Sequence, residues 1–189
     1  MPRVAVVGAG AWGTALAVTA AKRGATVDCV VPDAADERAL REAVVFAGVE
    51  QAVSVGPLGE HRAGYDAAVS AEYLETLPPR QKVPYLRDLE ASLGAEGRVA
   101  LQTIAATGQL NRPARAALES LRAYIWPGLS YSTPAEISQL VDRHTGLRVI
   151  AETHAPRHLA NSLALQRATF DTNFRDAAAD GEGAPRASY

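Results

Sequence analysis

The sequence predicts one α/β domain with a doubly wound, mostly parallel sheet, and three observations support that prediction. Strand-like and helix-like segments alternate along almost the whole chain, which is typical of parallel sheets with crossover helices. The first strand-like segment, residues 3–7, is β-rich and apolar, as expected of a strand buried on both faces. A glycine-rich turn, Gly8-x-Gly10-x-x-Gly13, joins this segment to a helix-like stretch rich in Ala and Leu.

The individual elements follow from local pattern and from the residues that end them. The predicted strands are short runs of β-branched and small apolar residues, at residues 3–7, 25–31, 51–55, 65–70, 98–104 and 147–152. The predicted helices cover residues 14–23, 34–47, 80–93, 114–124 and 133–144, and a long helix lies within residues 154–175. The fifth helix has a clear start, because Thr133 is a typical N-cap, Pro134 suits the first helical position and Glu136 completes a capping box.

The remaining segments are connections and a tail. Residues 72–77 are predicted to be short helical or irregular structure, and residues 105–113 and 126–132 are predicted loops. Residues 176–189 are rich in Ala, Gly, Asp and Pro, a composition that predicts a disordered tail. We therefore expect one domain over residues 1–175.

Composition excludes several classes of protein. The chain has 189 residues, of which 48% are hydrophobic, which is enough for one domain with a sizeable core. Its net charge of −2 gives no electrostatic reason to bind nucleic acid or an anionic membrane. The single cysteine, Cys29, excludes an intramolecular disulfide and a Cys-based metal cluster. No apolar run approaches the ~20 residues that span a bilayer, so we expect a cytoplasmic protein.

The glycine turn predicts a nucleotide-type binding site. Gly8 permits a tight turn, Gly10 lets a ligand approach the backbone, and the helix that begins near Trp12 and Gly13 offers free N–H groups to a negative group. Asp33 follows Gly13 by 20 residues, at the end of the second predicted strand, where a carboxylate can hold a ribose diol. These features fit NAD or the nucleoside of S-adenosylmethionine (SAM). Alternatively, the turn binds nothing and Asp33 caps the next helix.

Other polar and aromatic side chains have two interpretations each. Glu75 is either a catalytic or anion-binding carboxylate, or a capping and solvated residue. Tyr124, Trp126 and Tyr131 either line an apolar substrate pocket or form the edge of the core. The histidines lack metal-ligand spacing, so no metal site is predicted. Cys29 lies in a buried strand and is expected to be inert packing.

Two stretches resemble known families. Residues 12–17, WGTALA, are similar to the opening of the glycerol-3-phosphate dehydrogenases, which implies NAD, but this resemblance covers only the first 33 residues. Residues 65–75, YDAAVSAEYLE, resemble the strand-4 signature of the cyclopropane-fatty-acid synthases, which have a Rossmann-like class I SAM-dependent methyltransferase fold. That second resemblance continues, in order and spacing over residues 3–175, through GRVALQTI at 97–104, YIWPG at 124–128 and HTGLRV at 144–149.

The synthase resemblance implies a chemistry and a set of residues. In that family SAM supplies a methyl group to an acyl double bond, and a bound bicarbonate removes a proton so that a ring closes. Glu75 matches the family's bicarbonate-binding Glu, Gln102 stands where a His is usual, and His158 matches a family His. The family's adjoining Tyr is replaced by Leu159. Gly8, Gly10, Trp12, Gly13 and Asp33 would hold SAM.

Three functions remain open at this point. The first is a diverged synthase that uses SAM for methyl or methylene transfer to an alkene or carbanion of a hydrophobic, acyl-like or polyketide-like substrate. The second is a protein that has lost methyl transfer and acts as a cofactor-free cyclase or isomerase in specialised metabolism, or as a partner subunit. The third is an NAD-binding protein. Family members carry an N-terminal helical region over the site, which we expect this chain to lack. Either a second protomer or a partner subunit then covers the site, or the pocket is open and the chemistry has changed.

Overall fold

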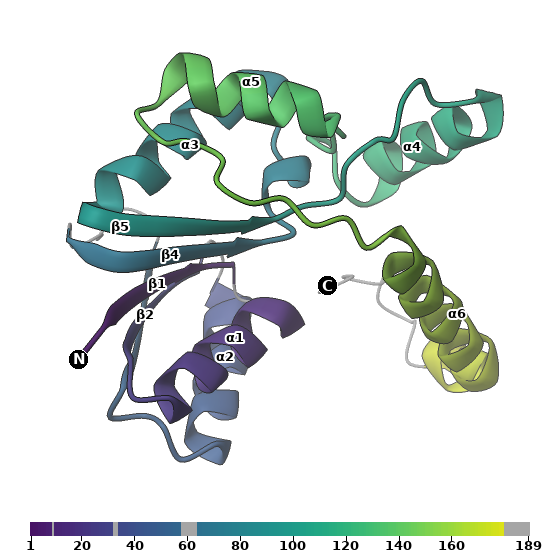
Figure 1. Cartoon of the computed structure of the whole chain (residues 1–189). Coiled ribbons are helices and arrows are strands. Elements are labelled where there is room, and N and C mark those ends of the chain that lie inside the picture. Colours follow the sequence, from purple (N-terminus) through teal and green to yellow (C-terminus); the bar gives the residue numbers. More distant parts are fainter. Residues whose placement is uncertain (9, 32–33, 58–63, 180–189) are drawn as a thin grey trace. The chain divides into compact units, whose positions relative to one another are not determined.

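The apolar segment at the start of the sequence forms the central strand of a parallel sheet. The computed structural model describes residues 1–8, 10–31, 34–57 and 64–179. Its five-stranded sheet has the order β3-β2-β1-β4-β5, and every neighbouring pair is parallel (Figure 1). The strands are β1 (Arg3–Val7), β2 (Thr26–Val31), β3 (Val53–Pro57), β4 (Tyr65–Ala71) and β5 (Leu93–Gln102). The order reverses between β1 and β4, so the predicted doubly wound fold is confirmed.

Helices cover both faces of this sheet, and each face has its own core. The helices of the sheet-bearing part are α1 (Ala11–Lys22), α2 (Ala34–Phe46), α3 (Pro79–Ser92), α4 (Arg112–Tyr124) and α5 (Pro134–His144). Figure 1 shows α1 and α2 on one face and α3 and α5 on the other. Val6, Val27 and Leu40 belong to the core beneath α1 and α2. Tyr65 and Leu86 belong to the core beneath α3 and α5.

The glycine turn after β1 is fixed by backbone contact. A Cβ atom placed on Gly13 would lie 1.8 Å from the carbonyl oxygen of Gly8, so only glycine fits there. Gly8 itself has a φ of 107°, a left-handed conformation that side chains rarely adopt. The first turn of α1 therefore packs directly on the turn that precedes it.

The capping predictions are confirmed in part. Thr133 and Glu136 form the predicted capping box at the start of α5. Helix α4 begins at Arg112 rather than at residue 114, because the Asn111 side chain accepts a hydrogen bond from the Ala114 amide and acts as N-cap. Helix α1 begins at Ala11 rather than at residue 14, since the Gly10 carbonyl already accepts from the Thr14 amide at 3.0 Å.

Two strand predictions were wrong. Strand β5 begins at Leu93 rather than at residue 98, because Leu93 pairs with Tyr65 and a register shift follows between Tyr65 and Ala67. The sixth strand, predicted at 147–152, does not form in the described part of the chain: Val149 and Ile150 are 47% and 80% exposed and β5 is the last strand of the sheet. β-branched residues favour a strand only where a paired neighbour supplies the ladder.

The chain divides into two compact units. One is Met1–Arg148, which contains the sheet, and the other begins at Val149. The second unit contains α6 (Pro156–Ala179), the long helix predicted within residues 154–175. Helix α6 includes the first residues of the predicted tail, and residues 180–189 lie outside the described residues, so the tail stays a prediction. The extent of the domain, residues 1–175, stays a prediction.

The contact at Gly13 makes a sharp prediction for stability. The substitution Gly13→Ala should lower the free energy of unfolding by about 3 kcal/mol or more, because its Cβ collides with rigid backbone. Gly24→Ala is the control, since Gly24 has a φ of 86° but no atom within 4 Å, and it should cost only about 1 kcal/mol. Urea unfolding measures both. Equal losses in the two variants would contradict the contact.

The burial of Cys29 predicts that its thiol does not react in the native protein. Its side chain is buried in β2, and burial, with the negative charge of Asp28, raises the pKa of the thiol to about 12. Iodoacetamide at about pH 8 should therefore leave the native protein unmodified and label it fully in denaturant, as read by mass spectrometry. Native labelling as fast as in denaturant would contradict this placement.

Candidate functional site

The carboxyl ends of β1, β4 and β5 form one edge of the sheet, at the point where the strand order reverses. A Cβ on Gly8, just after β1, would lie 3.6 Å from the carbonyl oxygen of Ala71, the last residue of β4. Next along the chain, the Glu72 amide donates to the carbonyl oxygen of Gln102, the last residue of β5, at 2.9 Å. Ligands of open α/β sheets bind at such an edge.

The predicted cofactor residues lie at this edge where the structure describes them. Gly8 begins the turn and Gly10 is the N-cap of α1, where no side chain caps the first amides. Those amides remain donors at a helix N-terminus, which suits a negatively charged group. Trp12 is 54% exposed in the first turn of the helix, and Gly13 is buried. Asp33 lies outside the described residues.

Glu75 is a buried carboxylate beside this edge. It lies in the short 3-10 helix Leu74–Thr76, between β4 and α3, and is 4% exposed. Its Oε2 accepts from the Thr103 hydroxyl at 2.7 Å, and its Oε1 accepts from the Ile104 amide at 3.1 Å. Its backbone carbonyl accepts from the Ser130 amide at 2.7 Å. The alternative that Glu75 is a solvated residue is therefore wrong.

A second carboxylate, Glu72, lies between the glycine turn and β5. Its φ of 54° makes it the only non-glycine residue with positive φ in the described part of the chain. Burial, and then the negative charge of Glu75, raise the pKa of the Glu72 carboxyl. The exposed Gln102 side chain contacts Glu72, with Nε2 3.4 Å from Oε1. Gln102 thus approaches Glu72, and Glu75 is bound by the residues that follow Gln102.

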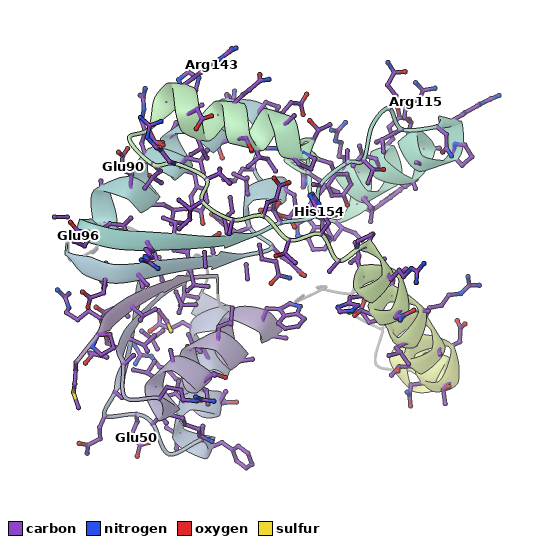
Figure 2. All side chains as sticks on the ribbon, viewed as in Figure 1. Glu50, Glu90, Glu96, Arg115, Arg143 and His154 are labelled. Carbon is purple, nitrogen blue, oxygen red and sulfur yellow. The ribbon has the colours of Figure 1, made fainter. Side chains whose placement is uncertain are left out.

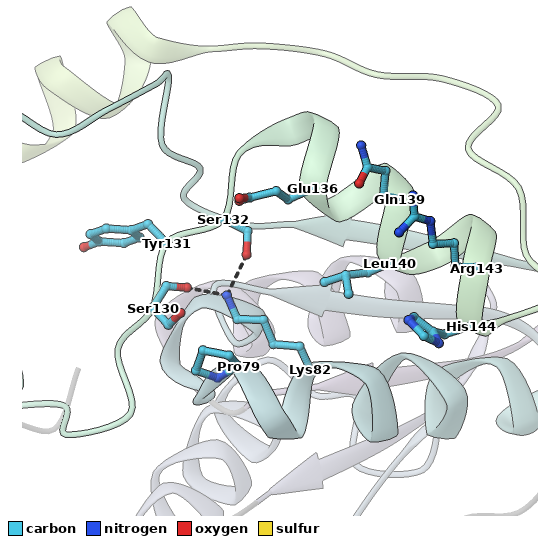
Figure 3. Close-up of a pocket in the computed structure, with 10 residues that line it drawn as sticks. All are labelled: Pro79, Lys82, Ser130, Tyr131, Ser132, Glu136, Gln139, Leu140, Arg143 and His144. Atoms are coloured by element: carbon cyan, nitrogen blue, oxygen red, sulfur yellow. Dashed lines mark hydrogen bonds between the residues drawn. The ribbon is translucent and has the colours of Figure 1, made fainter.

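A buried lysine on α3 was missed by the sequence analysis. Lys82 is 2% exposed, and its Nζ donates to the Ser130 carbonyl and, at 2.9 Å, to the Ser132 hydroxyl (Figure 3). Burial lowers the pKa of Lys82, while the charges of Glu75 and Glu136 act in the opposite direction. A lysine within a helix gives no sequence signal of burial, because such residues are usually solvated.

Lys82 also lines a pocket between α3 and α5. The pocket has a volume of about 360 Å³, and its lining residues are Pro79, Lys82, Ser130, Tyr131, Ser132, Glu136, Gln139, Leu140, Arg143 and His144 (Figure 3). Figure 2 shows Arg143 on α5 and Glu90 on α3, and the Glu90 carboxylate accepts from the Gly146 amide at 2.7 Å. None of the glycines of the β1 turn lines this pocket, so it is separate from the sheet edge.

The structure does not bring the three predicted pocket aromatics together in this pocket. Tyr131 lines it, and burial and the charge of Glu75 raise the pKa of the Tyr131 hydroxyl. Tyr124 ends α4 and is 87% exposed, while Trp126 is partly buried in the following turn, and neither lines the pocket.

A buried tyrosine, Tyr85, is a further residue that no sequence pattern singled out. The Tyr85 hydroxyl donates to Ser70 Oγ at 2.6 Å, and the Tyr85 ring packs on Tyr73 with centroids 5.1 Å apart. Burial raises the pKa of Tyr85 well above its ordinary value. The hydrogen bond between Tyr85 and Ser70 connects α3 to β4 close to Glu72.

His158 belongs to the second unit. It is exposed in the first turn of α6. His154 precedes that helix and pairs with Glu152, Nε2 to Oε1, at 2.8 Å, so the two histidines do not share one helix face.

Within residues 1–8, 10–31, 34–57 and 64–179, no three His, Cys, Asp or Glu side chains group as metal ligands. In the same residues, no helix has the length and apolarity to cross a bilayer.

Lys82 gives stability a specific pH dependence. Because the lowered pKa lies below the ordinary 10.5, the unfolded chain binds more protons between the two values, and stability should rise with pH there. The slope from this residue is at most about 1.4 kcal/mol per pH unit. In urea unfolding from about pH 8 to about pH 10, wild type and the Lys22→Met control should gain stability relative to Lys82→Met. The opposite effect of the raised pKa of Cys29 is common to all three proteins. Parallel profiles in all three would refute it.

Comparisons with known proteins agree with the fold. The family model described as mycolic acid cyclopropane synthetase matches residues 3–184. The tuberculostearic acid methyltransferase UfaA1 of Mycobacterium tuberculosis is 31% identical over 162 residues, which cover 84% of this chain and 38% of UfaA1. The chain thus spans well under half the length of this curated relative.

Solved structures match the same fold. The mycolic acid cyclopropane synthase CmaA1, complexed with SAH and CTAB, has a TM-score of 0.80 and 18% identity, over 95% of this chain and 67% of that one. The cyclopropane synthase MmaA2 of Mycobacterium tuberculosis has a TM-score of 0.79 and 16% identity, over 95% and 67%. At these identities the likeness shows the fold alone.

These matches decide between the two resemblances seen in the sequence. The neighbours include methyltransferases and a synthase in complex with SAH, the product left when SAM gives up its methyl group, and they give no support to NAD binding. The resemblance of residues 12–17 to dehydrogenases is therefore confined to the glycine turn. The chain has a Rossmann-like class I methyltransferase fold. Because the family model matches residues 3–184, the chain belongs to the mycolic acid cyclopropane synthetase family.

Proposed function

We propose that this chain transfers a methyl or methylene group from SAM to an alkene carbon of a hydrophobic acyl substrate. The observation that carries the proposal is Glu75: a buried carboxylate with both oxygens hydrogen-bonded, next to the edge formed by β1, β4 and β5. The printed name of UfaA1, a tuberculostearic acid methyltransferase, supports an acyl substrate.

The residues at the edge fit SAM as a ligand. A Cβ on Gly13 would collide with the Gly8 carbonyl, and the φ of 107° at Gly8 disfavours a side chain there, so a ligand at this turn would meet backbone. The uncapped amides of α1 suit the carboxylate of the SAM methionine group. Trp12 at the rim would contact the ligand, and Asp33 is proposed to hold the ribose. SAM would supply an electrophilic methyl group, and the chain would bind and orient it.

Glu75 would hold the bound bicarbonate that removes a proton after methyl transfer. A carboxylate whose oxygens accept from Thr103 and Ile104 is held in one position, and each oxygen has a further lone pair. Glu75 can therefore accept a hydrogen bond from the O–H of a bound bicarbonate. In the family, bicarbonate is the base that removes the proton. Gln102 can donate a hydrogen bond but cannot titrate. By resemblance to the family's His, we also propose a catalytic role for His158.

A second candidate function rests on two departures in the sequence. Gln102 stands where the family has a His, and Leu159 stands where it has a Tyr. These losses favour a protein that no longer transfers a methyl group and acts as a cofactor-free cyclase or isomerase, or as a partner subunit. A second protomer or a partner that covers the site remains part of both proposals.

Calorimetry and lipid analysis test the proposed function. SAM and SAH should bind the purified chain, NAD should not, and Asp33→Ala should abolish SAM binding. With labelled SAM and vesicles of a mono-unsaturated phosphatidylcholine, extracted acyl chains should gain one labelled CH₂ unit by mass spectrometry. Glu75→Gln should slow this turnover by roughly a hundredfold, with SAM affinity unchanged.

Controls separate the candidates. Glu50→Gln removes an equal charge before β3 and should keep full turnover. SAM binding without turnover would favour the partner-subunit role. Binding of NAD but not of SAM would overturn the proposed function, and unchanged turnover in Glu75→Gln would remove the role given to that carboxylate.

A further inference from the structure

Glu72 has a conformation that needs an explanation. Its φ of 54° lies in the left-handed region, which costs a residue with a side chain about 1–2 kcal/mol. Residues held this way concentrate at functional sites, where the surrounding structure imposes the conformation. Two features hold the Glu72 backbone in place. Glu72 directly follows Ala71, the last residue of β4, and its amide donates to the Gln102 carbonyl.

The position of Glu72 is at the reversal point of the sheet. Ala71, its chain neighbour, lies against Gly8, whose Cβ position is 3.6 Å from the Ala71 carbonyl. Glu72 therefore follows directly on the contact between the glycine turn and β4. Glu72 is the first carboxylate in the chain after the end of β4. A ligand bound at Gly8 and Gly13 would therefore lie at the same edge as Glu72.

Glu72 also has unused capacity to bind a cation. The neighbouring Glu75 already has both carboxylate oxygens bound, by Thr103 and Ile104. Glu72 has only the long contact of 3.4 Å with the Gln102 amide nitrogen, and no Lys or Arg of the described residues forms an ion pair with it. The raised pKa of its carboxyl reflects burial beside a second negative charge, a state that a nearby cation would relieve.

We propose that Glu72 is a specificity-determining residue that favours the cationic methyl donor SAM over its uncharged-sulfur product SAH. The inference rests on the proposed function, because it takes SAM as the ligand of the edge. SAM carries a sulfonium charge, whereas SAH has a neutral thioether and is otherwise the same molecule. A carboxylate beside the sulfur attracts SAM through Coulomb energy, and that attraction is lost once the methyl group has left. The residue thereby retains the donor and lets the product go.

Calorimetric titration of the full chain with SAM and with SAH tests this assignment. In Glu72→Gln the ratio of SAM affinity to SAH affinity should fall roughly tenfold, which corresponds to about 1.4 kcal/mol, with SAH affinity itself almost unchanged. Glu96→Gln, which removes a charge near the start of β5 (Figure 2), is the matched control and should leave the ratio as in wild type.

A second variant guards against misfolding. Glu72→Gly removes the charge and also relieves the left-handed strain, so it should fold at least as well as wild type and show the same fall in the ratio. Equal changes in SAM and SAH affinity, or none, in both variants would overturn the role of Glu72 while the proposed function stands. If wild type binds neither ligand, the proposed function falls and this inference falls with it.

Discussion

The parallel alignment of β1, β4 and β5 is the constraint on which the site depends. Register pairs Val7 with Ser70 and Ser70 with Leu101, so the three strands end side by side. Each residue that follows a strand therefore enters the same small region. The Gly8 turn, the strained Glu72 and the donors to Glu75 all come from these ends, and a shift of one strand by a single residue would separate them.

Backbone hydrogen bonds then connect the loops that leave this edge. Glu75 receives bonds from the segment after β5 and from the Ser130 amide, and the Ala106 amide donates to the Ser132 carbonyl at 3.0 Å. Lys82 adds the bonds that attach residues 130–132 to α3. A buried ammonium is costly, and the hydrogen bonds of Lys82 to this loop offset part of that cost. The pocket that Lys82 lines lies along α5, and none of the glycines of the β1 turn lines it.

The fold was largely predictable because its signals are local. Continuous apolar runs, the glycine turn and the Thr133 capping box each lie within a few residues, and all three are confirmed. The strand predicted at 147–152 failed because a strand depends on a neighbour that local pattern does not reveal. The site was predictable only where the sequence carried a motif. Glu75 was singled out by resemblance, and its catalytic role stays a proposal, whereas Lys82 and the Tyr85–Ser70 pair depend on contacts between distant segments.

We place the ligand site of this family member at the edge formed by β1, β4 and β5. Titration of isotope-labelled protein with SAH, followed by amide chemical shifts in NMR spectra, tests that placement directly. The largest shifts should occur at Gly8, Gly13 and Glu72, while Gln139 and His144 of the α3–α5 pocket should stay unchanged. Shifts confined to that pocket, or absent from the glycine turn at saturation, would contradict it.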